Sequence, residues 1–591
     1  MDCLEAGFPS REKIGHFRKS LLAWFEKCGR RFPWRMKVSP FQILVAEVLL
    51  QQTDAHRVWE FYESFIRRFP TSMSLARATL PEIRRFIEPI GLLYRAERLK
   101  QIAVILTNKY DGVVPESYKA LLEMPGIGPY AAAAIMCFAF GKVIPFQDVN
   151  FSRFYGRYFG LDLNMVRPQR DQRLFRLAQS VLPDQASASF NYAVLDFAAL
   201  ICTRNRPKCR CCVLRGTCSS THNSPSTIKI GIDLFSGAGG LALGASSAGL
   251  VLAYGMEGDE KVAGTYEFNF PRTAVVKQFL KEGDAMSVCT SLGIAPGSID
   301  IVMAGPPCQG FSISNLRTRN DANPSNHTWR IIIEFVKYLK PHGVIIENVC
   351  GMRSYRHGEV TGEIRTELVN QGYDCKILEL NAVDFGVPQN RRRLFITAVD
   401  RGTLADLPDA IAKRYSKPVS VSMAIKDLPL APNGNKVDGL PYKLFGSALV
   451  SYQKLMRKGA GKTVRNCLTS LNTDLIVQRF SLVPQGGNWE NIPENLFTTY
   501  SNPENCHRWL YRRLSDKHPS VTISDFRKNM LIHPWLNRTL SVREAARLQG
   551  FHDRFIFHGN LRSQQQQVAN AVPPQMAKAV IEIVLEILGG R

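Results

Sequence analysis

The spacing of apolar and polar positions changes near residue 227. Residues 11–222 follow helical spacing almost throughout. From Ile228 on, short apolar runs alternate with Gly-rich turns and helical stretches, which predicts strands and helices in alternation. The pattern therefore predicts a multidomain protein with an all-α first part and an α/β second part. A chain of 591 residues has room for roughly two to four domains.

One helix of the first part has a clearly marked start. Ser39 can cap it, Pro40 suits its first turn, and Gln42 completes a capping box. The run 41–53 that follows has Glu47 as its only charge. A carboxyl group among apolar neighbours has a raised pKa, which makes a general acid near neutral pH. The alternative, a surface glutamate that faces water, stays equally open at this stage.

The second part begins with the pattern of a nucleotide-binding βαβ unit. The apolar run 228–235 leads into a Gly-rich turn at 236–240, and a helix of small residues follows. A second apolar run, 250–256, ends in Glu257, about 20 residues after the turn, where an acid can bind ribose hydroxyls. No phosphate-binding lysine follows the turn, which favours S-adenosylmethionine over ATP.

Two further features of the first part indicate ligands. Gly126 and Gly128 lie in a tight turn before a helix of small residues. Such a turn lets backbone N–H groups approach a phosphate, although most are structural. Five of the 14 cysteines fall within 202–218. Zinc and an iron–sulfur cluster both suit the spacing of four of them, which are Cys202, Cys209, Cys212 and Cys218.

Together with Asp148, these cysteines and the hairpin 125–128 resemble the helix-hairpin-helix DNA glycosylases of the endonuclease III and adenine-glycosylase superfamily. The resemblance covers about residues 20–220. It implies that the four cysteines bind a [4Fe–4S] cluster and that Cys211 does not. It also implies that Asp148 stabilises an oxocarbenium ion or orients water, while Glu47 acts on the leaving base or on that water.

The residue after the hairpin narrows the activity. Family members with lyase activity carry a Schiff-base lysine there, so Tyr130 implies a monofunctional glycosylase. A tyrosine is typical of the branch that acts on thymine opposite guanine. Gln51 and Gln52 match the segment that fills the duplex after base flipping, but their run, Leu-Leu-Gln-Gln-Thr, is typical of adenine glycosylases. Residue 222 is not followed by the adenine-glycosylase domain that reads oxidised guanine, and thymine is favoured.

In the second part a nucleophile, an acid and a basic cluster follow one another. Cys308 lies in Pro-Pro-Cys-Gln, Glu347 begins Glu-Asn-Val, and the cluster 389–393 reads Gln-Asn-Arg-Arg-Arg. Their order resembles the DNA cytosine-5 methyltransferases over about residues 227–591, which implies a Rossmann-like α/β fold that binds S-adenosylmethionine. The cofactor residues implied are Phe235, Gly237, Gly239, Glu257, Asp284, Pro306 and Asn570.

The methyltransferase reaction explains these residue types, because C5 of cytosine is not nucleophilic. Addition of a Cys308 thiolate to C6 makes C5 enamine-like and able to accept a methyl group. By the resemblance, Glu347 hydrogen-bonds N3 and the exocyclic amine, Arg393 holds the pyrimidine, and Arg391 holds its surroundings. The alternative for Cys308 is a buried, inert thiol.

The composition indicates the class of partner. The formal charge is +24 and both parts are basic, as expected for contacts with DNA phosphates, with solubility alone as the alternative. The N-terminus lacks the pattern of a signal peptide, and the longest apolar stretch, 131–140, is too short for a membrane span. We expect a cytoplasmic, prokaryotic protein that binds double-stranded DNA and no membrane.

The predicted organisation has two enzymatic domains. A glycosylase domain covers 1–222, with its cluster loop at 202–218. A linker at 223–226 precedes a methyltransferase domain over 227–591, whose target-recognition region spans about 402–537.

The predicted function is bifunctional. The second domain methylates cytosine C5 in duplex DNA, in the setting of restriction and modification. The first removes thymine or uracil opposite guanine, the product of 5-methylcytosine deamination. An adenine mismatch glycosylase and a non-catalytic DNA-binding module are the alternatives for the first domain, and the pair Glu47 and Asp148 argues against the second of these. In the target-recognition region, 485–489 and 512–514 are expected to face DNA.

Overall fold

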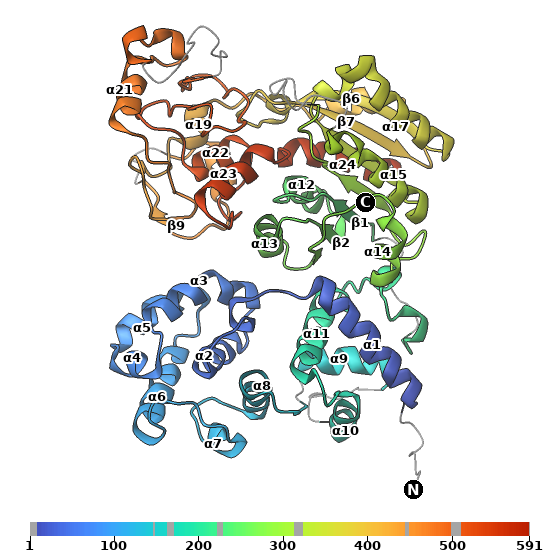
Figure 1. Cartoon of the computed structure of the whole chain (residues 1–591), viewed down its shortest axis with the longest axis vertical. Helices are drawn as coiled ribbons and strands as arrows, with labels where there is room; N and C mark the ends of the chain where they lie inside the picture. Colours follow the sequence, from blue (N-terminus) through green and yellow to red (C-terminus); the bar gives the residue numbers. More distant parts are fainter. Residues whose placement is uncertain are drawn as a thin grey trace. The chain divides into compact units, whose positions relative to one another are not determined.

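The protein is described by a computed structural model that covers residues 9–145, 148–161, 171–220, 228–311, 323–443, 448–497 and 510–589. It forms two compact units, one of residues up to Ser224 and one of nearly all residues from Pro225 on (Figure 1). The predicted linker 223–226 lies outside the described residues. Within those residues, every helix is too short or too polar to span a lipid bilayer.

The first unit is helical over its described residues, as the sequence predicts. The capping box at the start of α2 is present, because Ser39 Oγ accepts from the Gln42 N–H and the Gln42 side chain accepts from the Ser39 N–H. The elements are α1 (Arg11–Cys28), η1 (Pro33–Arg35), α2 (Pro40–Leu50), α3 (Ala55–Arg68), α4 (Ser72–Arg77), α5 (Leu80–Ile87), α6 (Tyr94–Lys109), α7 (Tyr118–Leu122), α8 (Pro129–Phe140), α9 (Val149–Phe159), α10 (Gln172–Val181) and α11 (Ser187–Leu200).

Two groups of buried side chains divide these helices into lobes. Helices α2 to α8 share one apolar core. The first helix, α1, instead packs with α9 and α11, where Phe17 lies 5.4 Å from Phe154 and Trp24 lies 4.9 Å from Phe197 between ring centroids (Figure 1). Helix α9 starts just after the chain leaves the first lobe, so its first residues lie where the two lobes meet.

The second unit is built on a seven-stranded sheet of order β3-β2-β1-β4-β5-β7-β6. The first five strands in this order are parallel, and β7 is antiparallel to both β5 and β6. The strands are β1 (Ile230–Leu234), β2 (Val251–Met256), β3 (Ala274–Val276), β4 (Ile301–Ala304), β5 (Gly343–Asn348), β6 (Asp374–Asn381) and β7 (Arg392–Val399). The helices around the sheet are α12 (Gly240–Ser247), α13 (Glu260–Asn269), α14 (Asp284–Leu292), α15 (Thr328–Leu339), α16 (Gly351–Ser354), α17 (Glu359–Asn370), α18 (Leu407–Ala412) and α24 (Pro574–Ile587).

The reversed direction of β7 determines which residues share an edge. Ligand sites of open α/β sheets lie at the carboxyl ends of the parallel strands. Because β7 runs the opposite way, its first residues lie at that same edge, and Asn348 at the end of β5 pairs with Leu394 near the start of β7. The basic cluster that precedes Leu394 is therefore brought beside the ends of β4 and β5.

The C-terminal segment closes this unit against its first helix. A side chain at Gly240 would place its Cβ 2.2 Å from the Val572 carbonyl oxygen, and one at Gly244 would meet Ala577 at 2.6 Å. Only glycine allows α12 and α24 to approach so closely. The residues around 570 thus reach the Gly-rich turn, although more than 300 positions separate them in the sequence.

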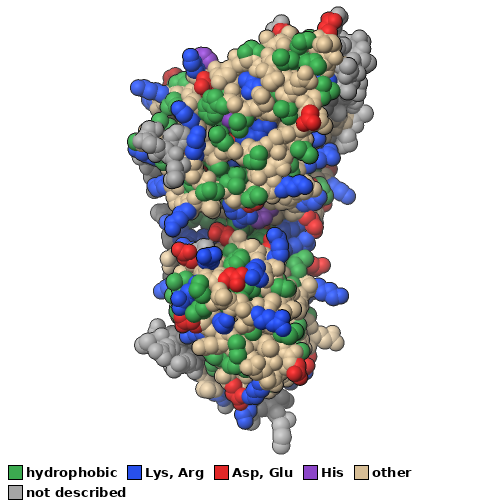
Figure 2. All heavy atoms as spheres, turned by 90° about the vertical axis from the view of Figure 1, so that its left-hand side faces the viewer, with side chains coloured by type: hydrophobic (Ala, Val, Ile, Leu, Met, Phe, Trp, Pro, Cys, Tyr) green, Lys and Arg blue, Asp and Glu red, His purple; other side chains and the backbone are tan. Residues whose placement is uncertain are grey.

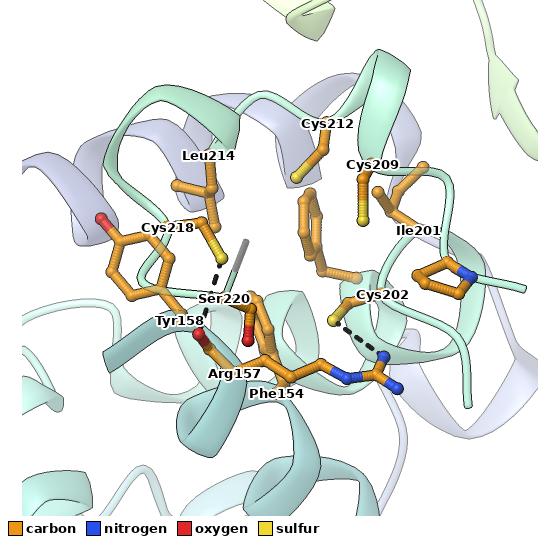
Figure 3. A pocket seen from close by; sticks show the side chains of 12 residues that line it. Phe154, Arg157, Tyr158, Ile201, Cys202, Cys209, Cys212, Leu214, Cys218 and Ser220 are labelled. Carbon is orange, nitrogen blue, oxygen red and sulfur yellow. Dashed lines mark hydrogen bonds between the residues drawn. The ribbon is translucent and has the colours of Figure 1, made fainter. Parts of the chain in front are cut away.

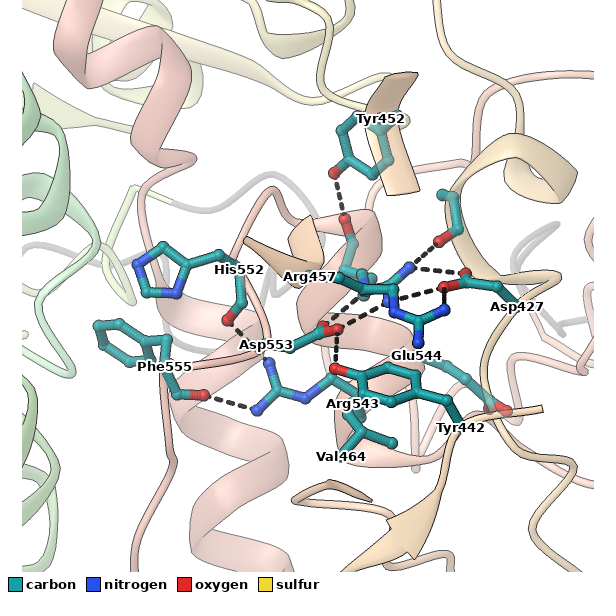
Figure 4. A network of polar contacts seen from close by, with 12 residues as sticks. Asp427, Tyr442, Tyr452, Arg457, Val464, Arg543, Glu544, His552, Asp553 and Phe555 are labelled. Atoms are coloured by element: carbon teal, nitrogen blue, oxygen red, sulfur yellow. Dashed lines mark hydrogen bonds and ion pairs between the residues drawn. The ribbon is translucent and has the colours of Figure 1, made fainter. Parts of the chain in front are cut away.

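Residues 402–537 form a region of the second unit that lies mostly outside the sheet. It contains α19 (Val421–Ile425), β8 (Leu440–Pro441), α20 (Ser451–Arg457), β9 (Thr463–Val464) and α21 (Asp474–Leu482), and it is followed by α22 (Val542–Leu548) and α23 (Leu561–Asn570). Arg547 of α22 donates to Asp427 at 2.8 Å and to Asp553 at 2.6 Å, all three fully or nearly buried. Tyr442 also donates to Asp553, at 2.5 Å (Figure 4). This buried network joins the variable region to the C-terminal helices.

One prediction for this region is wrong. Arg513 does not face DNA, because it is only 6% exposed. Its guanidinium donates to the carbonyls of Val483 at 2.6 Å, His533 at 2.9 Å and Phe480 at 2.6 Å. These contacts place it against a small separate core that includes Phe480 and Val483.

Charge on the surface follows the composition. Lys and Arg side chains are spread over the visible face of each unit, with fewer Asp and Glu among them (Figure 2). The net charge of +24 is therefore distributed over both units.

Candidate active sites

Three side chains from separate strands meet at the carboxyl edge of the sheet. Cys308 follows β4, Glu347 belongs to β5 and Arg393 to β7. Nε of Arg393 lies 3.0 Å from Oε1 of Glu347. The charges of both residues act on the pKa of the Cys308 thiol. The structure thus brings together the predicted nucleophile, acid and basic residue of the second unit.

Burial and a nearby cation have opposite effects on the pKa values of this group. Burial raises the pKa of Glu347, and Arg393 is the first of the charges that lower it. Burial also raises the pKa of the half-buried Cys308 thiol, while Arg393 lowers it and Glu347 raises it. A cation beside a thiol favours the thiolate, which is the nucleophilic form. Arg393 therefore opposes the effect of burial on both groups, although the pKa of each stays above its ordinary value.

Arg391 has a different position from Arg393. It is 1% exposed, and its guanidinium donates to the carbonyls of Ile523 at 2.8 Å, Ala569 at 2.9 Å and Ala571 at 3.1 Å. Its charge also lowers the pKa values of Glu347 and Cys308, but less than the charge of Arg393 does. Arg391 is thus a positioning residue that joins the start of β7 to the end of α23.

The Gly-rich turn after β1 forms a cradle with an acid at its side. Oε2 of Glu257 accepts from the Gly237 N–H at 2.9 Å. A Cβ at Gly237 would meet nothing within 4 Å, whereas one at Gly239 would lie 2.3 Å from Phe270. Phe235 has a positive φ of 53°. Open space above a turn, with a fixed carboxylate beside it, suits a nucleoside with ribose hydroxyls.

The other predicted cofactor residues differ in their surroundings. Asp284 starts α14 and accepts from the Lys281 N–H at 2.9 Å. Pro306 is buried just before Cys308. Asn570 ends α23, is exposed, and accepts from Gln566 at 2.8 Å. The cofactor contacts of these three residues stay predictions.

In the first unit, Glu47 is buried within α2. It is 7% exposed, which excludes the alternative of a surface glutamate. Burial raises its pKa to about 7, against the charge of Arg35 and assisted by the charge of Asp148. The sequence-based expectation of a raised pKa is therefore confirmed. A carboxyl group of this kind exchanges protons near neutral pH.

Asp148 caps α9 at the meeting point of the two lobes. Its Oδ1 accepts from the Phe151 N–H at 2.7 Å and its Oδ2 from Asn150 at 2.9 Å. Burial raises its pKa, and these hydrogen bonds lower it. Tyr130 lies at the start of α8, and burial, followed by the charges of Glu47 and Asp148, raises its pKa well above the usual value. Tyr130 therefore stays protonated beside two carboxyl groups.

The turn that follows α2 is held against the hairpin. Gln51 Nε2 donates to the Gly126 carbonyl at 2.9 Å. Buried Arg95 donates to the carbonyls of Leu49, at 2.8 Å, and Gln51. Gln52 takes a left-handed backbone conformation with φ of 55°. The segment predicted to enter DNA and the hairpin predicted to bind its backbone thus form one surface.

Two further charged residues are connected to Glu47, one directly and one through the other. Arg35 in η1 acts on the pKa of Glu47. Asp196 in α11 is fully buried and binds Arg35 through two contacts, at 2.8 and 3.0 Å. Asp196 is the only charge in the apolar stretch 187–200, which is the same signal that singled out Glu47. Applied to α11, that criterion could have found it.

The four spaced cysteines surround a cavity of ≈ 280 Å³ (Figure 3). Apolar and aromatic side chains complete its wall, among them Phe154, Tyr158 and Leu214. Among the described residues, no three His, Cys, Asp or Glu side chains converge on one point as for a single ion. Buried Cys211 is not part of the wall and directs its Sγ to the Lys208 carbonyl at 3.5 Å.

A chain of contacts connects this cavity to Asp148. Asn150 donates to Asp148 at 2.9 Å, and Arg153 donates to Asn150 at 2.9 Å and to the Cys202 carbonyl at 3.1 Å. One turn further along α9, Arg157 donates to Cys202 Sγ at 3.7 Å. The cysteine loop therefore supports the helix that Asp148 caps.

Two family matches account for most of the chain. Residues 230–586 match the family described as C-5 cytosine-specific DNA methylase. Residues 45–180 match the HhH-GPD superfamily of base excision DNA repair proteins.

Individual relatives match one unit each. The type II methyltransferase M1.HphI of Haemophilus parahaemolyticus is 33% identical over 60% of this chain and 86% of its own length. A thymine/uracil-DNA glycosylase of Methanothermobacter thermautotrophicus is 37% identical over 34% of this chain and 92% of its own length. An adenine DNA glycosylase of Buchnera aphidicola is 34% identical over 35% of this chain, but over only 59% of its own length.

Proposed function

Because this chain belongs to the C-5 cytosine-specific DNA methylase family, and its N-terminal unit to the HhH-GPD superfamily of base excision DNA repair proteins, we propose that it methylates cytosine and repairs the decay product of 5-methylcytosine. The observation that carries the proposal is the presence of a complete set of chemical groups in each unit. Cys308, Glu347 and Arg393 form one set, and Glu47, Tyr130 and Asp148 form the other.

In the second unit, Cys308 is the nucleophile. Its thiolate, favoured by the Arg393 charge, adds to C6 of a cytosine that has been flipped out of the duplex. Glu347 hydrogen-bonds N3 and the exocyclic amine, with its orientation fixed by the contact of 3.0 Å to Arg393. The thiolate leaves again once the C5 proton has been removed.

The methyl group comes from S-adenosylmethionine, which supplies an electrophilic methyl when bound. The turn has open space at Gly237, and Glu257 beside it would bind the ribose hydroxyls. Phe235, Asp284, Pro306 and Asn570 complete the proposed site. Relatives named type II methyltransferases support a restriction–modification setting.

In the first unit, Glu47 and Asp148 have separate roles in base removal. Glu47 exchanges a proton with the leaving base or the attacking water, which its pKa of about 7 permits at neutral pH. Asp148 stabilises the positive charge that develops on the sugar. Tyr130 stands in place of a Schiff-base lysine, so the proposed product is an abasic site with an intact strand.

We assign the cysteine cavity to a [4Fe–4S] cluster. The four thiols surround a cavity and do not converge on one point, which fits a cluster that takes one thiolate per iron and does not fit a lone zinc ion. Cys202, Cys209, Cys212 and Cys218 would hold the cluster. Its role here is structural, because the loop it organises supports α9 and Asp148.

Thymine or uracil opposite guanine is the proposed substrate of the first unit. The thymine/uracil-DNA glycosylases that match this unit are covered over 92% and 88% of their lengths. The matching adenine glycosylase is covered over only 59% of its length. An adenine glycosylase is the second candidate, because the Leu-Leu-Gln-Gln-Thr run is typical of that branch.

The decisive experiment measures base release by the whole protein on labelled duplexes, followed by alkaline cleavage. The duplexes carry thymine–guanine, uracil–guanine, adenine–guanine, adenine–oxidised guanine or 5-methylcytosine–guanine pairs. Release of thymine and uracil is expected. Release of adenine alone would establish the second candidate, and no release on any duplex would leave a DNA-binding module. Methyl transfer to unmethylated duplex DNA is measured in parallel with labelled S-adenosylmethionine.

A further inference from the structure

A buried ion cluster of Asp196, Arg30 and Arg35 takes no part in the reaction steps proposed for the first unit. Asp196 is fully buried in α11 and accepts hydrogen bonds from two arginines. Arg30 binds it through its backbone N–H and Nε, both at 2.8 Å, and Arg35 binds it through both Nη atoms. Their charges overcome burial and hold the pKa of Asp196 below its ordinary value. Burying an ionised carboxylate costs desolvation free energy even when two arginines pair with it, so stability alone does not explain this cluster.

The ion pair places the Arg35 guanidinium in a defined position. It lies 4.2 Å from the centroid of the Tyr192 ring and 5.0 Å from that of Phe32. Tyr192 in turn stacks on Phe138 of α8, with ring centroids 3.9 Å apart and an interplanar angle of 3°. Arg35 is thus held between Asp196 and an aromatic stack, and its element η1 packs against α2, the helix that carries Glu47.

Arg35 differs from every other group that acts on Glu47. The groups facing Glu47 are Asp148 before α9, Tyr130 and Cys137 of α8, and Tyr192 of α11. Burial raises the pKa values of Tyr130, Cys137 and Tyr192, so they are neutral near pH 7. Asp148 is a like charge. Arg35 is the cation that acts on the Glu47 pKa among the described residues.

We propose that Asp196 and Arg35 form a positioning pair for base removal, in which the buried carboxylate holds the guanidinium where its charge acts on Glu47 and so determines the pH range over which Glu47 transfers its proton. The inference rests on the proposed function of the first unit. It adds residues that touch neither the base nor the sugar and act only through Glu47.

The sign of the effect follows from the charge. Arg35 stabilises the ionised form of Glu47, so its loss shifts the ionisation of Glu47 to higher pH. The limb of the pH–rate profile that titrates near pH 7 in the wild type should therefore move upward in Arg35→Gln, by on the order of one pH unit. Asp196→Asn should move it in the same direction, because the guanidinium is no longer held. Arg35→Lys keeps the charge and should restore most of the wild-type position.

Arg30 offers a matched control. It binds the same carboxylate of Asp196 but does not appear among the charges that act on Glu47. Arg30→Gln should therefore destabilise the first unit like the other variants and leave the pH profile in place. Thermal unfolding of each variant, alongside the rates, separates a loss of stability from a change in proton transfer.

The experiment is single-turnover release of thymine from a thymine–guanine duplex by the full chain between about pH 5 and pH 9. An upward shift in Arg35→Gln and Asp196→Asn, absent in Arg30→Gln, supports the pair. Lower rates with an unmoved profile, or an equal shift in Arg30→Gln, would overturn it. Failure of the wild type to release any base would instead refute the proposed function, so the two results cannot be confused.

Discussion

Each unit buries one glutamate at its candidate site, and the two glutamates differ in how their charge is compensated. Glu47 and Glu347 are both 7% exposed, and burial raises the pKa of both. Glu347 has Arg393 in direct contact at 3.0 Å. Glu47 instead has the like charge of Asp148 near it, and its cation, Arg35, is bound to Asp196.

The difference shows that burial alone does not define the role of a carboxyl group. A direct ion pair keeps Glu347 oriented and opposes its neutralisation, which suits a residue that holds a base while Cys308 reacts. Glu47 has a neighbouring carboxylate, and its cation is bound to another residue. Its pKa is therefore about 7, which suits proton exchange. Both pKa values are raised, but only Glu347 has a cation in direct contact, and this difference in pairing fits two different roles.

The strongest test of the separation between the sites is Cys308→Ser. Methyl transfer should fall by at least about 10³-fold, because no thiolate is left to activate C5. Base release on a thymine–guanine duplex should keep its wild-type rate. Both rates are measured on the same preparation, and a parallel loss of base release would show that the two centres are not independent.

Asp148→Asn tests the other centre with the fold preserved. Asparagine caps helices as well as aspartate, so α9 should stay intact. Base release should fall by about 10²- to 10⁴-fold, since no charge remains to stabilise the sugar cation. Unchanged base release with an unchanged melting temperature would contradict the role of Asp148 and favour a binding module.

The proposed iron–sulfur cluster also distinguishes the two units, because only the first unit is proposed to depend on metal. Cys212→Ser should remove the bound iron and the visible absorbance and lower base release, while methyl transfer is retained. Cys211→Ser is the matched control, one residue away and outside the cavity wall, and it should keep the full iron content. Equal iron loss in both variants would refute the assignment of ligands.

The smallest effect concerns stability and pH. Glu47 ionises near 4.5 in the unfolded chain and at about 7 in the folded one. Its protonated form favours folding, so this stability is complete below pH 4.5 and is lost as the pH rises through about 7. Glu47→Gln removes this pH-dependent loss of stability. It should raise the free energy of unfolding of the first unit at pH 8 by on the order of 3 kcal/mol, with little effect near pH 4.

Glu347→Gln should instead destabilise the second unit at pH 8, because losing the ion pair with Arg393 outweighs the relief from burying a charged carboxylate. Thermal unfolding of both variants between pH 5 and pH 8 checks the pair of predictions. A stabilising Glu347→Gln at pH 8 would show that the two carboxyl groups behave alike.

Several local features were predictable because they depend on neighbours in the sequence. The capping box of Ser39 and Gln42, the apolar helix around Glu47 and the alternation of strands and helices after residue 227 all follow from short-range spacing. Arg513 and Arg391 were not predictable in the same way. An arginine with free access to DNA and one that binds buried carbonyls have the same local sequence signal, and the structure buries both.

The type of each unit, the order of its chemical groups and the four spaced cysteines follow from residue identity and spacing along the chain. Which of these groups meet depends on the folded arrangement. The reversal of β7 brings Arg393 to Glu347, the meeting of two lobes brings Asp148 to Glu47, and α11 brings Asp196 to Arg35. Electrostatic coupling depends on distance and burial in space, and neither quantity can be calculated from the separation of residues along the chain.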